Sequence, residues 1–184
     1  MKDQDELPRT ADLRTNTSRL SVGEFVKAHP RPALHLALQV NTSGKSAPAD
    51  GKTTQEKSYE RTAVIPAGST SVQRYNDRIA FLGKRAGNPF PNMISVGRAL
   101  NNDLVVVLST VSKLHGYFLC EGPTWTFIDH GSKNGTKIND AALAKNERKA
   151  LAPGDRIQLG LELSAIFLTP EKLYDFLRRS SSGV

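Results

Sequence analysis

The stretch from Gly116 to Ile138 reads GYFLCEGPTWTFIDHGSKNGTKI and decides the fold class. It contains three short runs rich in aromatic and apolar residues, GYFLC, WTFID and TKI, which are separated by residues typical of turns. The Asn134-Gly135 dipeptide before the last run is favoured in two-residue hairpin turns. Because no helical periodicity links the runs, the stretch predicts consecutive antiparallel strands.

Similar short runs continue on both sides of this stretch. They are RIAFLGKR (78–85), MISVG (93–97), LVVV (104–107), RIQLG (156–160) and SAIFL (164–168). Many short strands at close spacing, with no helices between them, are typical of an antiparallel sandwich or barrel. We therefore expect an all-β fold of about ten to eleven short strands.

The flanks predict a short helix at each end. Ser21 and Glu24 form a capping-box pattern that starts a helix at Val22, and Pro30 lies beyond its end. Residues 32–40 alternate like a strand, and Thr169-Pro170 opens a helix at the C-terminus. The predicted organisation is a disordered tail (1–19), an extension with helix, strand and long mobile loop (20–77), the β domain (78–169), and a terminal helix with tail (170–184).

Composition excludes several classes of protein. A single cysteine, Cys120, rules out an intramolecular disulfide framework and a multi-cysteine metal site, and the four histidines lack metal-ligand spacing. We expect no cofactor. The N-terminus has no secretory pattern, and no apolar run approaches the ~18 residues of a membrane span. These features predict a cytoplasmic protein that does not bind membranes.

The net charge of +7 raises the question of nucleic-acid binding. Residues 1–80 hold twelve basic and nine acidic side chains, and residues 81–184 hold thirteen and nine. No run of five basic residues and no basic stripe with interleaved aromatics occurs. The diffuse excess is more typical of a solvated surface, so we expect no nucleic-acid partner.

Function in a sandwich usually lies on the loops at one end, and three predicted loops carry unusual residues. The first holds Gly97-Arg98, the second is STVSKLH (109–115), and the third is GSKNGT (131–136). Taken singly, each has an ordinary explanation as a solvated arginine, a loop hydroxyl or a hairpin turn.

In this order and spacing, together with LAPGDRIQLG (151–160), the motifs closely resemble the forkhead-associated (FHA) domain over residues 78–169. The resemblance implies a non-catalytic β-sandwich that recognises phosphothreonine. Such a ligand brings ~1.5–2 negative charges and three acceptor oxygens, which suit converging cationic and hydroxyl donors.

The resemblance also implies individual roles. Arg98 would bind a phosphate oxygen, Ser112 would donate its hydroxyl to the phosphate, and Asn134 would hold the peptide main chain. Lys113 and Lys133 stand where other residue types are frequent in the family and would act as point-charge donors. The remaining motif residues would shape the loops: Gly97, His115, Ser132, Gly135 and Thr136.

The predicted protein is an adaptor or regulator that binds phosphothreonine proteins downstream of a Ser/Thr protein kinase. Some bacterial relatives are regulated by a phosphorylated threonine near their own N-terminus, and Thr53 and Thr54 are the candidate phosphosites here, although ordinary solubilising hydroxyls remain the favoured reading. Thr10, Thr15 and Thr17 lie in the predicted tail and are also expected to be accessible to a kinase.

Three alternatives compete with this hypothesis. A phosphate-independent interaction module would have the same sandwich but would bind its partners without recognising a phosphate. A nucleic-acid binder would use the positive charge. A hydrolase would use Ser112 and His115, with Asp129 as a third member, but no nucleophile-elbow sequence surrounds the serine. In a hydrolase His115 would face Ser112, whereas a structural histidine would face the loop backbone.

Overall fold

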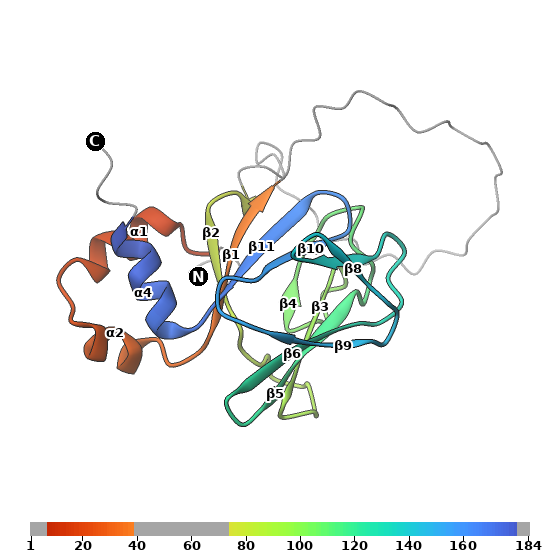
Figure 1. Cartoon of the computed structure of the whole chain (residues 1–184), viewed down its shortest axis with the longest axis horizontal. Helices are drawn as coiled ribbons and strands as arrows, with labels where there is room; N and C mark the ends of the chain where they lie inside the picture. The colour runs from red at the N-terminus through yellow and green to blue at the C-terminus, as the bar shows by residue number, and fades with distance from the viewer. Residues whose placement is uncertain (1–6, 39–73, 180–184) are drawn as a thin grey trace.

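The computed structural model describes residues 7–38 and 74–179, and its strands form two packed sheets (Figure 1). The six-stranded sheet has the order β2-β1-β11-β10-β7-β8, and the five-stranded sheet has the order β4-β3-β5-β6-β9. The predicted all-β sandwich of about eleven strands is confirmed. The strands are β1 (Ala33–Leu38), β2 (Arg78–Phe81), β3 (Met93–Gly97), β4 (Leu104–Val105), β5 (Gly116–Glu121), β6 (Thr124–Asp129), β7 (Thr136–Ile138), β8 (Ala141–Leu143), β9 (Arg148–Leu151), β10 (Arg156–Leu159) and β11 (Leu163–Leu168).

The main core lies between the two sheets. Side chains alternate along a strand, so Phe118 of β5 and Phe127 of β6 share the inner face and pair across the two strands. Their rings meet edge to face with centroids 4.9 Å apart, and both side chains are fully buried. Phe167 of β11 faces them from the other sheet within the same apolar cluster. This core fixes the strand ends from which the site loops emerge.

Strand β1 belongs to the sandwich. It lies between β2 and β11 in the six-stranded sheet, with Ala33 opposite Phe81 on one side and Leu168 on the other. The expected division at residue 78 is therefore wrong at this point, because it separates a central strand from its sheet. The loop expected over residues 41–60 lies outside the described residues, as do Thr53 and Thr54.

Three helices pack against β2, β1 and β11 of the six-stranded sheet, and we call them the helical cap: α1 (Thr10–Thr17), α2 (Val22–Ala28) and α4 (Pro170–Arg179). They gather on the left of Figure 1, beside β1, β2 and β11. A second apolar cluster joins them to the sheet; its buried members are Leu13, Phe25, Ala33, Ile79, Leu168, Leu173, Tyr174 and Leu177. The cap is a small hydrophobic core of its own.

Helices α2 and α4 confirm the helices predicted at the two ends. The capping box of α2 is complete, because the Glu24 amide donates to Ser21 Oγ at 3.3 Å and the Ser21 amide donates to Glu24 Oε2 at 2.8 Å. These bonds pair backbone donors that a helix start leaves open. Local sequence is enough to place this helix.

Helix α1 corrects the expectation of a disordered tail over residues 1–19. No side chain caps its first turn, so the local sequence gives little sign of it. Contacts from distant residues hold it instead: the Thr10 amide donates to the Asp77 carbonyl at 3.1 Å, and Arg14 Nε donates to the Leu177 carbonyl at 3.1 Å. The segment before it also pairs with the edge of β2, where the Ile79 amide donates to the Pro8 carbonyl at 2.9 Å.

Two further strands were not expected. Strand β8 is short and largely exposed, and β9 takes up Arg148 and Lys149, the end of the KNERK segment (145–149) that the sequence favours as a solvated loop. Both strands lack alternating apolar residues and are defined by pairing with β7 and β6. The sandwich also contains one parallel pair among its described strands, β3 with β4.

Candidate functional site

Three loops meet at one end of the sandwich. Strand register places the end of β3, the start of β5 and the end of β6 side by side, because Val96 pairs with Gly116 and Gly116 pairs with Asp129. The loops are 98–103 after β3, 106–115 before β5, and 130–135 after β6. They carry the three motifs singled out in the sequence.

Ser112 is the junction of these loops. Its carbonyl accepts the Arg98 amide at 2.9 Å, and its Oγ accepts the Lys133 amide at 2.9 Å. Arg98, Ser112 and Lys133 are thus direct neighbours although they come from three different loops. The Ser112 hydroxyl proton is not used in the Lys133 contact, since Oγ accepts there, so it is available to an incoming acceptor.

Close contact between the first two loops explains a glycine at position 97. A Cβ at Gly97 would lie 2.3 Å from the backbone oxygen of Lys113, which is closer than a real contact allows. The buried Asn102 side chain ties the same loops, since its Nδ2 donates to the Lys113 carbonyl at 2.7 Å and to the Ala99 carbonyl at 2.8 Å. Sequence analysis did not identify Asn102, and no motif marks it.

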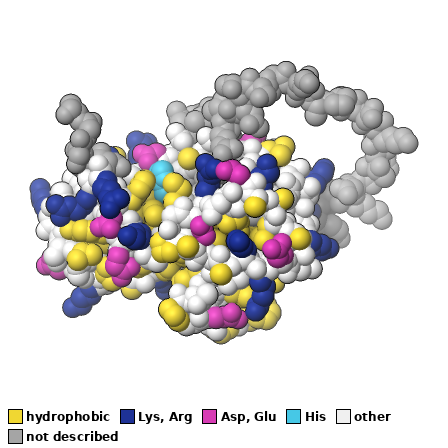
Figure 2. All heavy atoms as spheres, viewed as in Figure 1, with side chains coloured by type: hydrophobic (Ala, Val, Ile, Leu, Met, Phe, Trp, Pro, Cys, Tyr) yellow, Lys and Arg dark blue, Asp and Glu magenta, His cyan; other side chains and the backbone are white. Residues whose placement is uncertain are grey.

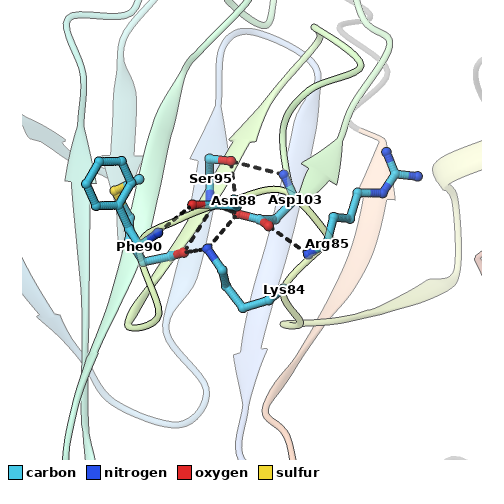
Figure 3. Close-up of polar contacts among 7 residues, drawn as sticks. Lys84, Arg85, Asn88, Phe90, Ser95 and Asp103 are labelled. Atoms are coloured by element: carbon cyan, nitrogen blue, oxygen red, sulfur yellow. Dashed lines mark hydrogen bonds and ion pairs between the residues drawn. The ribbon is translucent and has the colours of Figure 1, made fainter.

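The far end of the Arg98 loop is fixed by Asp103, whose side chain is fully buried. Figure 3 shows its carboxylate among Lys84, Arg85, Asn88 and Ser95. The Arg85 amide donates to Oδ1 at 2.8 Å, the Ser95 amide donates to Oδ2 at 2.8 Å, and Asn88 Nδ2 also donates to Oδ2. Burial raises the pKa of Asp103, but these hydrogen bonds outweigh it and hold the pKa below its usual value.

A buried polar chain holds the second and third loops together. The Ser112 amide donates to His115 Nδ1 at 3.2 Å, so Nδ1 carries no proton. Nε2 then carries the ring proton and lies 3.2 Å from Thr136 Oγ1, which donates to Asp129 Oδ2 at 2.6 Å. Burial lowers the pKa of His115 against the opposing influence of Asp129, which lies 3.8 Å away. His115 is therefore a neutral link between loops.

Asp129 is the acceptor at the end of this chain and the start of the third loop. Its Oδ1 accepts the Ser132 amide at 2.7 Å, and its Oδ2 accepts the Ser132 hydroxyl at 2.6 Å. Burial raises the pKa of Asp129, but the hydrogen bonds from Ser132 and Thr136 bring it below its usual value. The sequence motifs indicate Asp129 only as a candidate triad member, although the Asp-x-x-Ser spacing of residues 129–132 is typical of such a turn.

Asn134 and Gly135 form the outer part of the third loop. Asn134 Nδ2 donates to the Thr110 carbonyl at 2.8 Å, and the Gly135 carbonyl accepts the Gly160 amide at 3.1 Å. Gly135 has φ +72°, a left-handed conformation that favours glycine. The exposed Asn134 side chain is anchored to the second loop by its bond to Thr110.

The loops that meet at the junction carry three cationic residues, Arg98, Lys113 and Lys133. All three are exposed, and none makes a hydrogen bond or ion pair with its side chain in the described part of the protein. Loops that meet and carry a hydroxyl donor and three cationic residues suit a compact anion such as a phosphate group. The structure brings the five predicted binding residues onto adjoining loops, but their roles remain predictions.

The hydrolase alternative finds no support in this geometry. His115 contacts the backbone amide of Ser112, while Ser112 Oγ is engaged by the Lys133 amide. A serine nucleophile needs its hydroxyl bonded to the base. Within residues 7–38 and 74–179, no group of three or more His, Cys, Asp or Glu side chains is arranged to hold a metal ion.

The predicted threonines of the N-terminal region are placed only in part. Thr10 and Thr17 are buried in α1, where their hydroxyls donate to the carbonyls of Asp77 and Leu13, and Thr15 is exposed. The expectation that all three are open to a kinase is therefore wrong for Thr10 and Thr17 in the folded protein. None of the described helices is long and apolar enough to cross a membrane.

The basic side chains are spread rather than clustered. Figure 2 shows Lys and Arg side chains scattered over the visible face among acidic and hydrophobic ones. This agrees with the even distribution of charge along the sequence. A continuous basic groove of the kind that tracks a nucleic-acid backbone is not seen on this face.

Comparisons with known proteins identify a family whose matched region includes the three site loops. A family model described as "FHA domain" matches residues 94–160. The glycogen accumulation regulator GarA of Mycolicibacterium smegmatis is 34% identical over 60% of this chain and 66% of its own length. GarA of Mycobacterium tuberculosis is 30% identical over 68% of this chain and 72% of its own length.

Solved structures similar to this chain include the FhaA FHA domain, with 25% identity, a TM-score of 0.41, and coverage of 50% of this chain and 88% of that one. Another is the N-terminal FHA domain of S. cerevisiae RAD53P with a phosphothreonine peptide, with 23% identity, a TM-score of 0.44, and coverage of 53% and 89%. The matched residues 94–160 run from β3 to the end of β10 and include all three site loops. The chain belongs to the FHA domain family.

Proposed function

We propose that this protein binds phosphothreonine peptides at the Ser112 junction and acts as an adaptor or regulator in Ser/Thr kinase signalling. The observation that carries the proposal is the meeting of three loops at Ser112, because these loops carry Arg98, Lys113 and Lys133 and the amides of Arg98 and Lys133 both bond to Ser112. A phosphate group brings negative charge and three acceptor oxygens to such donors.

The roles within the site follow from the side chains. Arg98 offers a planar guanidinium that can donate two parallel hydrogen bonds to a phosphate. Ser112 offers a hydroxyl proton, and the two lysines add point charges with less directional control. Asn134, anchored through Nδ2 on Thr110, leaves its amide oxygen for a main-chain donor of the peptide.

The proposed role has no catalytic step. The site offers donors and no activated nucleophile or base, because His115 is buried and already bonded. The relatives named as regulators are consistent with an output that depends on the bound partner. We place this activity in the cytoplasm, with phosphothreonine proteins and a Ser/Thr kinase or its substrates as partners.

The test is a binding titration with matched phosphothreonine, phosphoserine and unmodified peptide libraries. The parent should bind the phosphothreonine library selectively. Arg98→Ala should lose roughly 2 to 5 kcal/mol of binding free energy, more than ten-fold in affinity, because a partner of a desolvated charge pair is removed. Arg19→Ala removes an exposed arginine near the helical cap and should bind like the parent.

Two outcomes would contradict the proposal. If the Arg98 variant and the parent bound the phosphothreonine peptides with equal affinity, the Ser112 junction would not be the binding site. Binding of unmodified peptide as tightly as phosphopeptide, by a folded protein, would identify a phosphate-independent interaction module.

A further inference from the structure

The turn between β8 and β9 lies against the third site loop. The Asn146 amide donates to the Asp129 carbonyl at 2.9 Å, which fastens the turn to the residue that starts this loop. The Lys145 side chain lies over Gly131: a Cβ at that glycine would be 2.7 Å from Lys145 Cε and 3.1 Å from Nζ. Lys145 is therefore held beside the loop that carries Lys133.

The turn has its own internal support. The Ala144 amide donates to Glu147 Oε2 at 2.9 Å, and the Glu147 amide donates to the Ala144 carbonyl at 3.1 Å. The nearest carboxylate along the chain is thus engaged with the backbone of the turn. Lys145 is exposed, and its ammonium makes no ion pair within the described residues.

A carboxylate lies near the Asn134 end of the same loop. Asn134 is bonded to the Thr110 carbonyl, and Thr110 Oγ1 lies 3.4 Å from Glu162 Oε2. A peptide crossing the site would meet a carboxylate beyond Asn134 and an ammonium beyond Gly131. This asymmetry distinguishes the two flanks of the site by charge.

We propose that Lys145 is a specificity residue that extends the peptide site and binds an anionic side chain of the ligand on the Gly131 flank. The inference rests on the proposed phosphothreonine function and adds a second requirement to the ligand. The anion is a carboxylate or a second phosphate, since both are acceptors for an ammonium. An exposed pair of this kind contributes a factor of about two to five in affinity.

The experiment uses a phosphothreonine peptide with a neutral background, in which a single Glu is moved through every flanking position. The parent should bind one or more of the Glu peptides about two- to five-fold more tightly than the neutral peptide. This gain should disappear in Lys145→Ala, and Lys145→Glu should prefer Lys over Glu at the same position. A further peptide carries a second phosphothreonine at that position in place of Glu. If the natural anion is a phosphate, this peptide should gain more affinity than the Glu peptide.

Lys27→Ala is the matched control, because Lys27 is an exposed lysine of α2 in the helical cap. It changes the net charge equally and should keep the full gain from Glu. The same gain in Lys145→Ala as in the parent, or no gain at any position, would overturn the inference while leaving the phosphothreonine site in place. Failure of the parent to bind the neutral phosphothreonine peptide would instead refute the proposed function.

Discussion

The loop end and the helical cap of this protein use their side chains in opposite ways. In the cap, apolar side chains such as Phe25 and Leu173 are buried against the sheet. At the loop end, the buried groups are polar and link one loop to another, while the cations Arg98 and Lys133 are exposed. Burial of apolar side chains stabilises the cap, whereas the buried polar contacts at the loop end fix the positions of the site loops.

This difference in burial separates the residues that hold the site loops in place from the residues proposed to bind the ligand. His115, Asp129 and Thr136 are buried and bonded to each other, so they fix the loops without reaching a ligand. Arg98 and Lys133 contribute little to folding, because exposed side chains seldom do. Variants should therefore divide into those that change stability and those that change binding.

The largest effect is expected in the cap. Phe25→Ala removes a ring that is 1% exposed and packs against Tyr174, and should lower the free energy of unfolding by about 3 to 5 kcal/mol. Chemical denaturation measures this. Val22→Ala, in the same helix at 46% exposure, should change it by less than ~0.5 kcal/mol. Equal effects of the two variants would show that the cap is not a packed core.

A smaller effect should separate two serines of the site loops. Ser112→Ala should weaken phosphopeptide binding by about 1 to 3 kcal/mol, because its hydroxyl both accepts the Lys133 amide and faces the proposed phosphate. Ser132→Ala should act mainly on stability, because that hydroxyl donates to Asp129. Calorimetric titration and denaturation of both variants measure the difference. A larger loss of binding in Ser132→Ala would reverse the assignment.

The smallest effect concerns acid stability. Burial lowers the pKa of His115, so between the usual histidine pKa and the folded one the unfolded chain binds more protons. Stability from this group is complete above about pH 6.5 and falls as the pH drops below it. The lowered pKa values of Asp103 and Asp129 add a second loss, below about pH 4. Denaturation at stepped pH measures both.

His115→Gln tests the first of these losses. The folded variant should lack the His115 part of the decline between pH 6.5 and 5, while His130→Gln, at an exposed position, should keep it. A parent whose stability is constant over this range would show that His115 is not held neutral by the fold.

The elements that the sequence predicted are those whose cause is local. The capping box of Ser21 and Glu24 defines the start of α2, and alternating aromatic residues define β5 and β6. Helix α1 depends on Asp77 and Leu177, which are distant in the chain, and β8 and β9 exist through pairing with their neighbours. Tertiary contacts of this kind leave no periodic pattern in the sequence.

The candidate site divides in the same way. The motifs predicted the loops that carry Arg98, Ser112 and Asn134, because motif spacing follows the order of loops at one end of a sandwich. They did not predict Asn102 as the tie between the first two loops or Asp129 as the anchor of the third. A lone Asn or Asp near a strand end is a common surface feature, so its burial becomes apparent only in the fold.

The most direct test of this account is to map the backbone amide signals of the protein by NMR while a phosphothreonine peptide is added. We expect the largest shifts at Arg98, Ser112, Lys133 and Asn134, with α1, α2 and α4 unchanged. The unmodified peptide should produce none of these shifts. Shifts concentrated on the helical cap, or equal shifts with both peptides, would contradict the central claim that the loop end is a phosphate-dependent binding site.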